Sequence, residues 1–278
     1  MDESLIIFPK IARQFLDNCI PKIKNKLSLN FDDDSSARDI VHVFLDPFEK
    51  IREKREALIS SSNPVSTAVI FAPGPSLEEK MDVLGNLDAQ SSIFDFIFVD
   101  GAAKLALDRN FKIDLLVTDL DGLSDEKILH IHDNIGATVI IHCHGDNIQE
   151  IRNFLSSVTL DERYIFTTQA SPTSNVYNWG GFTDGDRAIF VALQLKYKKI
   201  ILVSMDLNAR QIGRLSKERF KNLDKKDLDL SRFPIKEKKL EIAFKTLKWL
   251  ASKEPRAKIF TLSSEKTFPF LENLETIS

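Results

Sequence analysis

Glycine is scarce in this chain of 278 residues, which contains ten of them, about half of what an average usage of roughly 7% would give. Nine of the ten lie between Gly74 and Gly185. Cysteine is scarcer still, since Cys19 and Cys143 are the only two. So few cysteines exclude a disulfide-stabilised scaffold, and so little glycine excludes a collagen-like or glycine-rich disordered chain.

Long apolar runs and a surplus of one charge are missing as well. The least charged stretches, residues 58–77 and 164–183, are interrupted by Pro, Ser, Asn and Gly, unlike the ~20 apolar residues of a membrane-spanning helix. The net charge of −3 gives no electrostatic reason to expect nucleic acid. The first residues lack the basic and apolar regions of a signal peptide. We therefore expect a cytoplasmic protein with no membrane or nucleic-acid partner.

Short apolar runs rich in Ile, Val and Phe alternate with helix-like stretches between about residues 65 and 208. Runs without polar alternation are typical of strands buried on both faces of a parallel sheet. The expected strands are 67–72, 94–99, 114–118, 137–142, 164–168 and 199–205. Strand–helix alternation predicts an α/β fold, with a Rossmann-like, mostly parallel sheet and helices on both faces.

Both ends of the chain look helical and strongly charged, which divides the chain into three regions. Residues 1–62 predict a helical N-terminal region, with one helix ending before Pro21 and another over about 46–59. Residues 63–210 form the predicted α/β catalytic domain. Residues 211–278 predict a helical C-terminal region with a final strand over 257–262, packed on that domain. A homodimer through these charged ends stays open.

The C-terminal region begins with a basic segment that includes Lys217 and Arg219, interleaved with acidic residues. This pattern is typical of a solvated face. The alternative is a flap that brings a lysine to a phosphate.

Small and polar residues follow six of the expected strands. They include Gly74 after the first strand, Asp100 after the second, Asp119 after the third and Gln169 after the fifth. In an open parallel sheet, ligands bind outside the carboxyl ends of the strands. We therefore expect a ligand site along this edge.

Asp119 and Asp121 give the sharpest signal within that edge. Two carboxylates two residues apart can point the same way once the chain turns, and Gly122 permits the turn. Carboxylates held so close repel each other unless a cation lies between them, and hard oxygen ligands favour Mg²⁺. Asp100 is the natural third carboxylate. The alternative is a solvated acidic turn.

Two glycine-containing loops precede helices and could present backbone N–H groups to a phosphate. In the first, Ser76 and Glu79 have the spacing of a capping box, so the alternative is simply a well-made helix start. In the second, residues 179–188, Thr183 or Asp184 could cap the following helix. Arg187 could bind phosphate or pair with a neighbouring aspartate.

The stretch from His142 to Asn147 places two histidines and an aspartate after the fourth strand. No Cys-x-x-Cys or His-Glu-x-x-His pattern accompanies them, which argues against zinc. A polar wall in which His144 or Asp146 contacts substrate fits the pattern better.

Taken in order, these motifs resemble the archaeal MptE-type 6-hydroxymethyl-7,8-dihydropterin diphosphokinases. The resemblance covers roughly residues 65–208, with a weaker likeness around 238–252. That family is related to the thiamine pyrophosphokinases, whose Asp-x-Asp metal motif resembles Asp119–Asp121. The chain departs from the family pattern at Cys143, where a small residue such as alanine is expected.

The resemblance implies an ATP-dependent diphosphokinase of tetrahydromethanopterin or folate-type pterin biosynthesis. It would move the diphosphoryl group of ATP to the hydroxymethyl group of a reduced pterin, release AMP and require Mg²⁺. The expected metal ligands are Asp100, Asp119 and Asp121, and His144 or Asp146 would orient the attacking hydroxyl. The residues expected to surround phosphates or pterin are Gly74, Pro75, Ser76, Asp100, Gly101, Thr168, Gln169, Gly181, Phe182, Thr183, Asp184, Asp186 and Arg187.

Three alternatives stay open at this point. A thiamine pyrophosphokinase-like enzyme would share the metal motif, and a nucleotide-sugar-dependent transferase could share the fold. A non-catalytic module would bind Mg-nucleotide without turnover.

Overall fold

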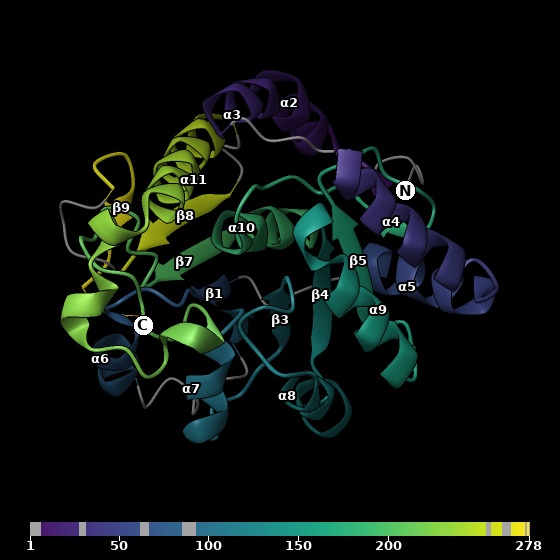
Figure 1. Ribbon diagram of the computed structural model, residues 1–278, viewed down its shortest axis with the longest axis horizontal. Helices are drawn as coiled ribbons and strands as arrows, with labels where there is room; N and C mark the ends of the chain where they lie inside the picture. The colour runs from purple at the N-terminus through teal and green to yellow at the C-terminus, as the bar shows by residue number, and fades with distance from the viewer. Residues whose placement is uncertain are drawn as a thin grey trace.

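Nine strands form one sheet in the order β6-β5-β4-β3-β2-β1-β7-β8-β9, and every neighbouring pair is parallel. The computed structural model describes residues 7–27, 32–61, 67–84, 93–253, 257–262, 268–275 and 277. The boundary expected between residues 62 and 63 lies outside these described residues. Figure 1 shows the sheet running through the centre with helices around it.

The strands are short, as burial on both faces predicts. Their bounds are β1 Thr67–Phe71, β2 Phe94–Val99, β3 Leu115–Thr118, β4 Thr138–Cys143, β5 Tyr164–Thr168, β6 Val176–Tyr177, β7 Lys199–Val203, β8 Lys258–Thr261 and β9 Glu272–Asn273. The α-helices are α2 Lys10–Asn18, α3 Ile20–Leu27, α4 Asp32–Leu45, α5 Glu49–Ser61, α6 Leu77–Val83, α7 Ala102–Asp108, α8 Asp125–His130, α9 Ile148–Ser157, α10 Asp184–Gln194 and α11 Pro234–Lys253.

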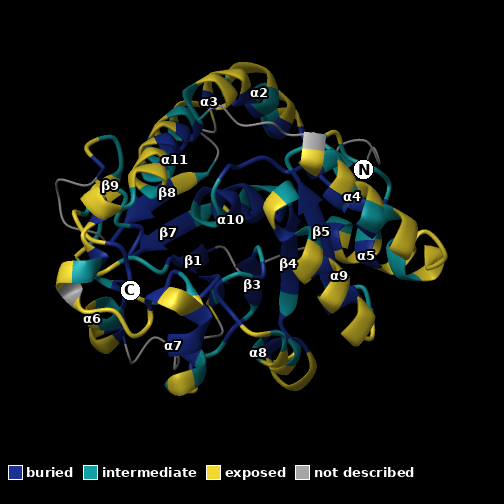
Figure 2. Ribbon diagram, viewed as in Figure 1, coloured by how far each residue is buried: buried dark blue, intermediate teal, exposed yellow. Residues whose placement is uncertain are grey.

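Helices cover both faces of the sheet. One face packs Phe71 and Phe98 against α4 and α6–α9, and the other packs Ile70 and Ile97 against α2, α3, α5, α10 and α11. Strands β1 to β5 are almost completely buried, as Figure 2 shows. These layers confirm the predicted α/β fold with helical ends. Within the described residues, no helix has the length and apolar character needed to cross a membrane.

Each expected strand is present with its ends within two residues of the prediction. The two-residue strands β6 and β9 are too short to leave a sequence pattern. The expectation that the first helix ends before Pro21 holds for α2, but Pro21 also lies in the first turn of α3, where a missing N–H costs nothing. Helix α4 was not predicted.

The strand order reverses beside β1. Strands β2 to β6 extend in sequence order to one side of β1, whereas β7 lies on its other side. In open α/β sheets, such a switch point opens a crevice at the carboxyl ends of the strands. The fold therefore places a ligand site where β1 and β7 end.

Candidate active site

A cavity of about 230 Å³ lies along the carboxyl edge of the sheet. Its walls come from the ends of β1–β5 and β7, from the first turns of α4, α10 and α11, and from residues 211–217. The cavity therefore lies where open parallel sheets bind their ligands.

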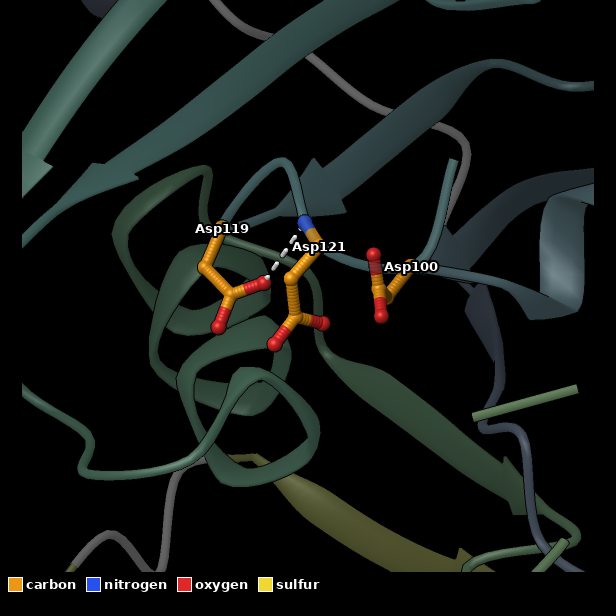
Figure 3. A group of neighbouring side chains, drawn as sticks. All are labelled: Asp100, Asp119 and Asp121. Carbon is orange, nitrogen blue, oxygen red and sulfur yellow. Dashed lines mark hydrogen bonds between the residues drawn. The ribbon is translucent and has the colours of Figure 1, made fainter. Parts of the chain in front are cut away.

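Asp100, Asp119 and Asp121 meet in the middle of this cavity. Each offers a carboxylate oxygen, and the three oxygens lie within 4.8 Å of one another (Figure 3). The N–H of Asp121 donates to Oδ1 of Asp119 at 3.2 Å, which holds the turn closed. Asp100 and Leu120 both have positive φ, 45° and 72°. Backbone strain of this kind is characteristic of functional sites.

Asp100 is the most buried of the three carboxylates, only 4% exposed. Its Oδ1 accepts hydrogen bonds from Thr118 Oγ1 at 2.9 Å and from the N–H of Gly122 at 3.1 Å. A side chain at Gly122 would occupy the place of this carboxylate, so the position requires glycine. Burial, followed by the negative charges of Asp119 and Asp184, raises the pKa of Asp100 well above its ordinary value. A divalent cation here would relieve both penalties.

Three lysines from the C-terminal region face the carboxylates. Lys217 forms an ion pair with Asp121, and Lys236 and Lys239 reach the cavity from the first turns of α11. Burial lowers the pKa of Lys236, although Asp184 and Asp100 act in the opposite direction. Carboxylates and lysines facing each other across a cavity fit a metal-bound polyphosphate. The basic segment thus delivers a lysine to the site, rather than serving only as a solvated face.

His144 is directed at the carboxylate cluster. Its Nδ1 accepts a hydrogen bond from the N–H of Asp146 at 3.2 Å, so the proton of a neutral ring lies on Nε2, 3.6 Å from Oδ2 of Asp119. Burial alone would raise the pKa of Asp119, but the hydrogen bond and charge of His144, with Lys217 and Lys239, lower it. His144 therefore holds Asp119 ionised, while Asp146 stands exposed at the cavity wall.

Buried charged side chains hold the loop before α10 in place. Asp186 accepts hydrogen bonds from the N–H groups of Phe182 at 3.0 Å and Thr183 at 2.6 Å, and the Thr183 hydroxyl caps the helix. Arg187 is 1% exposed and donates to the carbonyl of Gly180 at 3.1 Å. Burial, followed by the negative charge of Asp119, raises the pKa of Asp184 to about 7. The buried guanidinium of Arg187 counteracts that rise.

The N-terminal region supplies one wall of the cavity through α4. The N–H of Gly145 donates to Oδ1 of Asp34 at 2.8 Å, and a side chain at Gly145 would collide with Cβ of Asp33. Arg38, one turn along α4, donates to the carbonyl of Ser171 at 2.9 Å. The helix is thereby fastened to the loops after β4 and β5.

The structure brings most of the predicted residues to the cavity but not all. Lining residues that the sequence predicted are Gly74, Pro75, Asp100, Asp119, Asp121, His144, Asp146, Gln169, Phe182, Thr183 and Asp184. Predicted residues that are not among the lining residues are Ser76, Gly101, Thr168, Gly181, Asp186 and Arg187.

The six residues outside the lining shape the loops behind it. Ser76 does not form the expected capping box, because its N–H and hydroxyl bond to Asp206 Oδ2 at 2.9 Å and Ser204 Oγ at 3.1 Å. Gly101 packs against the backbone of residue 215, and Gly181 against that of Arg187. Thr168 is fully buried and accepts from the N–H of Ala170 at 3.1 Å. Asp186 and Arg187 hold the α10 loop, as described above.

Other residues line the cavity without having been assigned to it from sequence. They include Asp33, Asp34, His142, Met205, Asp206, Gln211, Lys217, Lys236 and Lys239. Asp206 and His142 carried a signal, since Asp206 follows an expected strand and His142 ends one. The α4 and α11 residues carried none, because only tertiary packing brings them to the sheet edge.

Residues 42–211 match the family described as 6-hydroxymethylpterin diphosphokinase MptE-like. The chain belongs to this family. Three relatives carry the name 6-hydroxymethyl-7,8-dihydropterin pyrophosphokinase. The Methanothermobacter thermautotrophicus relative is 35% identical over 67% of this chain and 75% of its own length, and the Methanocaldococcus jannaschii relative 34% over 66% and 74%. The Pyrococcus furiosus relative is 30% identical over 87% of this chain and 95% of its own.

The matched region contains all three clustered carboxylates, Asp100, Asp119 and Asp121. It excludes the first turn of α4 and the whole of α11. The MptE-like part of the chain thus carries the acidic centre of the cavity, and segments on either side of it complete the walls.

Proposed function

We propose that this chain is a Mg²⁺-dependent diphosphokinase that transfers the diphosphoryl group of ATP to 6-hydroxymethyl-7,8-dihydropterin. The proposal rests on one observation: three carboxylates and three lysines line the same cavity and face each other. The relatives of this chain are named for the same activity. The place of the cavity at the sheet's switch point supports a ligand-binding role.

In the proposed reaction, the hydroxymethyl oxygen forms a bond to the β-phosphorus of ATP. The bond between that phosphorus and the oxygen bridging it to the α-phosphorus breaks, AMP leaves, and the hydroxyl proton is lost. Such a transfer needs positioning and neutralisation of charge more than covalent chemistry.

Asp100, Asp119 and Asp121 would hold Mg²⁺, and their clustered oxygens fit its preference for hard oxygen ligands. When bound, Mg²⁺ would neutralise charge on the phosphates of ATP. His144 keeps Asp119 ionised and oriented. Lys217, Lys236 and Lys239 would neutralise the remaining phosphate oxygens. Asp146, exposed at the wall next to His144, is placed to accept a hydrogen bond from the pterin hydroxyl.

A direct assay tests this proposal. The chain is incubated with ATP, Mg²⁺ and 6-hydroxymethyl-7,8-dihydropterin, and AMP and the pterin diphosphate are quantified by chromatography. Equal amounts of the two products are expected, and neither should form with EDTA or without the pterin. ADP in place of AMP would show single phosphoryl transfer, and AMP formed with thiamine but not with the pterin would favour the thiamine alternative. Binding of Mg-ATP without any product would leave the non-catalytic module.

A further inference from the structure

The positive charge of the cavity lies around the carboxylate cluster. Lys217 pairs with Asp121, the charge of Lys239 acts on Asp119, and Lys236 interacts with Asp184 and Asp100. At the β4–β5 end, the lining residues include Asp34 and Gln169, whose side-chain oxygens are hydrogen-bond acceptors. A polyphosphate suits the lysines and a bound cation, and a ring with N–H donors suits the β4–β5 end.

Asp34 has one satisfied and one unsatisfied oxygen. Asp34 is only 5% exposed. Its Oδ1 accepts a hydrogen bond from the N–H of Gly145, whereas Oδ2 is buried and has no hydrogen-bond partner among the described residues. A buried acceptor left unpaired is unfavourable, and more so when it carries a charge. A ligand that donates to Oδ2 would remove this penalty.

Gln169 presents a second unpaired acceptor, and its orientation is fixed by a chain of hydrogen bonds. The Thr167 hydroxyl donates to the carbonyl of Ile141 at 3.4 Å, so it can only accept from Nδ1 of His142, 3.3 Å away. Burial lowers the pKa of His142 well below its usual range, so the ring is neutral and its Nε2 is an acceptor.

The amide nitrogen of Gln169 then donates to His142 Nε2 at 3.4 Å. Its carbonyl oxygen, Oε1, is buried without a partner in the described part of the chain. Both unpaired acceptors thus belong to residues that line the same end of the cavity.

We propose that Asp34 and Gln169 form the subsite for the pterin ring and bind its N–H donor edge, the 2-amino group and N3–H. This inference rests on the function proposed above and assigns the β4–β5 end of the cavity to the acceptor substrate. An aminopyrimidinone presents adjacent N–H donors along this edge, which matches two acceptors. The aminopyrimidine of thiamine presents a donor beside a ring-nitrogen acceptor, so one oxygen would face a lone pair.

The first test replaces Asp34 with Asn. The Asp34→Asn side chain keeps an acceptor for the Gly145 N–H, but turns an N–H group toward the donors of the ring. We expect the KM for the dihydropterin to rise at least about tenfold and the KM for ATP to stay within about twofold. Gln169→Met removes the acceptor and keeps a side chain of similar size, so it should also raise the KM for the dihydropterin. Asp46→Asn, an exposed carboxylate that directly follows the same helix, is the matched control and should change neither.

The second test needs no stable variant. A dihydropterin with hydrogen in place of the 2-amino group should lose at least about tenfold in kcat/KM with the wild-type chain. Where Asp34→Asn folds, as judged by circular dichroism, it should distinguish the two substrates less well than the wild type does. Such a change in preference would not follow from a merely structural role of Asp34.

The outcomes separate the two proposals. A wild-type chain that forms no pterin diphosphate overturns the proposed function, and the subsite falls with it. An active wild type whose Asp34→Asn variant keeps the same pterin KM overturns the subsite alone, as does a wild type that uses both pterins equally well.

Discussion

The backbone N–H of Gly145 donates a 2.8 Å hydrogen bond to the carboxylate of Asp34, although 111 residues separate them in the chain. This bond joins the N-terminal helix α4 to the loop after β4. Through this bond, part of the charged N-terminal region forms a wall of the candidate active site.

The close approach at Gly145 gives a first prediction. In Gly145→Ala, the new Cβ would overlap Cβ of Asp33, so α4 must move away from the β4 loop. We expect a loss of about 1–3 kcal/mol in the free energy of unfolding and weaker pterin binding. Denaturant unfolding checks the first effect and calorimetry the second. Gly185→Ala, whose Cβ would make an ordinary 3.5 Å contact with Met205, controls for stability; equal stability of the two variants would contradict the close packing of α4.

The carboxylate cluster gives a second prediction. Asp121→Asn should lower the rate of AMP formation at least about 100-fold, because it removes a charged oxygen ligand. The fold should persist, since the Asp121 side chain is 32% exposed and the repulsion relieved within the cluster offsets the lost ion pair with Lys217. Titration calorimetry with Mg-ATP should show weaker binding. Asp224→Asn, 78% exposed on the surface, should behave like the wild type. Full activity of Asp121→Asn would rule out the proposed ligand set.

Two lysines on α11 allow a paired comparison. Lys236 lines the cavity, whereas Lys238, two residues on, is exposed and outside it. Lys236→Ala should raise the KM for ATP about tenfold, as expected for a lost charge-assisted contact, and leave the pterin KM nearly unchanged. Lys238→Ala should alter neither constant. Steady-state kinetics with each substrate varied in turn would show this, and equal effects of the two variants would remove α11 from the phosphate site.

A fourth prediction concerns acid stability at Asp161. Its carboxylate accepts from Arg163 and lies 2.9 Å from His132 Nε2, a ring stacked on Tyr164. Burial alone would raise the pKa of Asp161, but the hydrogen bonds from Arg163 and His132 lower it. Its stabilisation is therefore complete above its unfolded pKa of about 3.9 and is lost as the pH falls through the lower folded pKa.

Urea unfolding of wild type and Asp161→Asn between about pH 6 and 2.5 checks this linkage. The wild type should be the more stable at pH 6, and the difference should shrink as the pH falls. A difference that stays constant over that range would show that ionisation of Asp161 does not contribute.

The sequence predicts the sheet and the centre of the site because their signals are local. Apolar runs such as 94–99 make buried strands wherever they pack, and Asp119 and Asp121 follow a strand whose end must lie at the ligand edge. Helix α4 also left a signal, since Ala37, Val41 and Leu45 recur every four residues and are all buried. That spacing is typical of one helix face.

The rest depends on distant packing. Nothing in the run of acidic residues at the start of α4 distinguishes Asp34 from Asp33, and nothing in α11 distinguishes Lys236 from Lys238. Asp33 and Asp34 both line the cavity, but it is Asp34 that accepts from Gly145; Lys236 lines the cavity and Lys238 does not. How each helix lies on the sheet decides both differences. For Arg187 the sequence left a phosphate contact and a structural role both open, because charged residues beside glycines fit a ligand loop and a buried support equally well.

The arrangement along the sheet edge has an evolutionary consequence. The acidic centre comes from the middle of the chain, whereas α4 and α11 reach the cavity from opposite ends of the sequence. If α4 binds the acceptor and α11 the donor, as proposed, substitutions in α4 would change the acceptor and substitutions in α11 the donor without altering the carboxylates. A lineage could exchange substrates one at a time while the chemistry of group transfer stays the same.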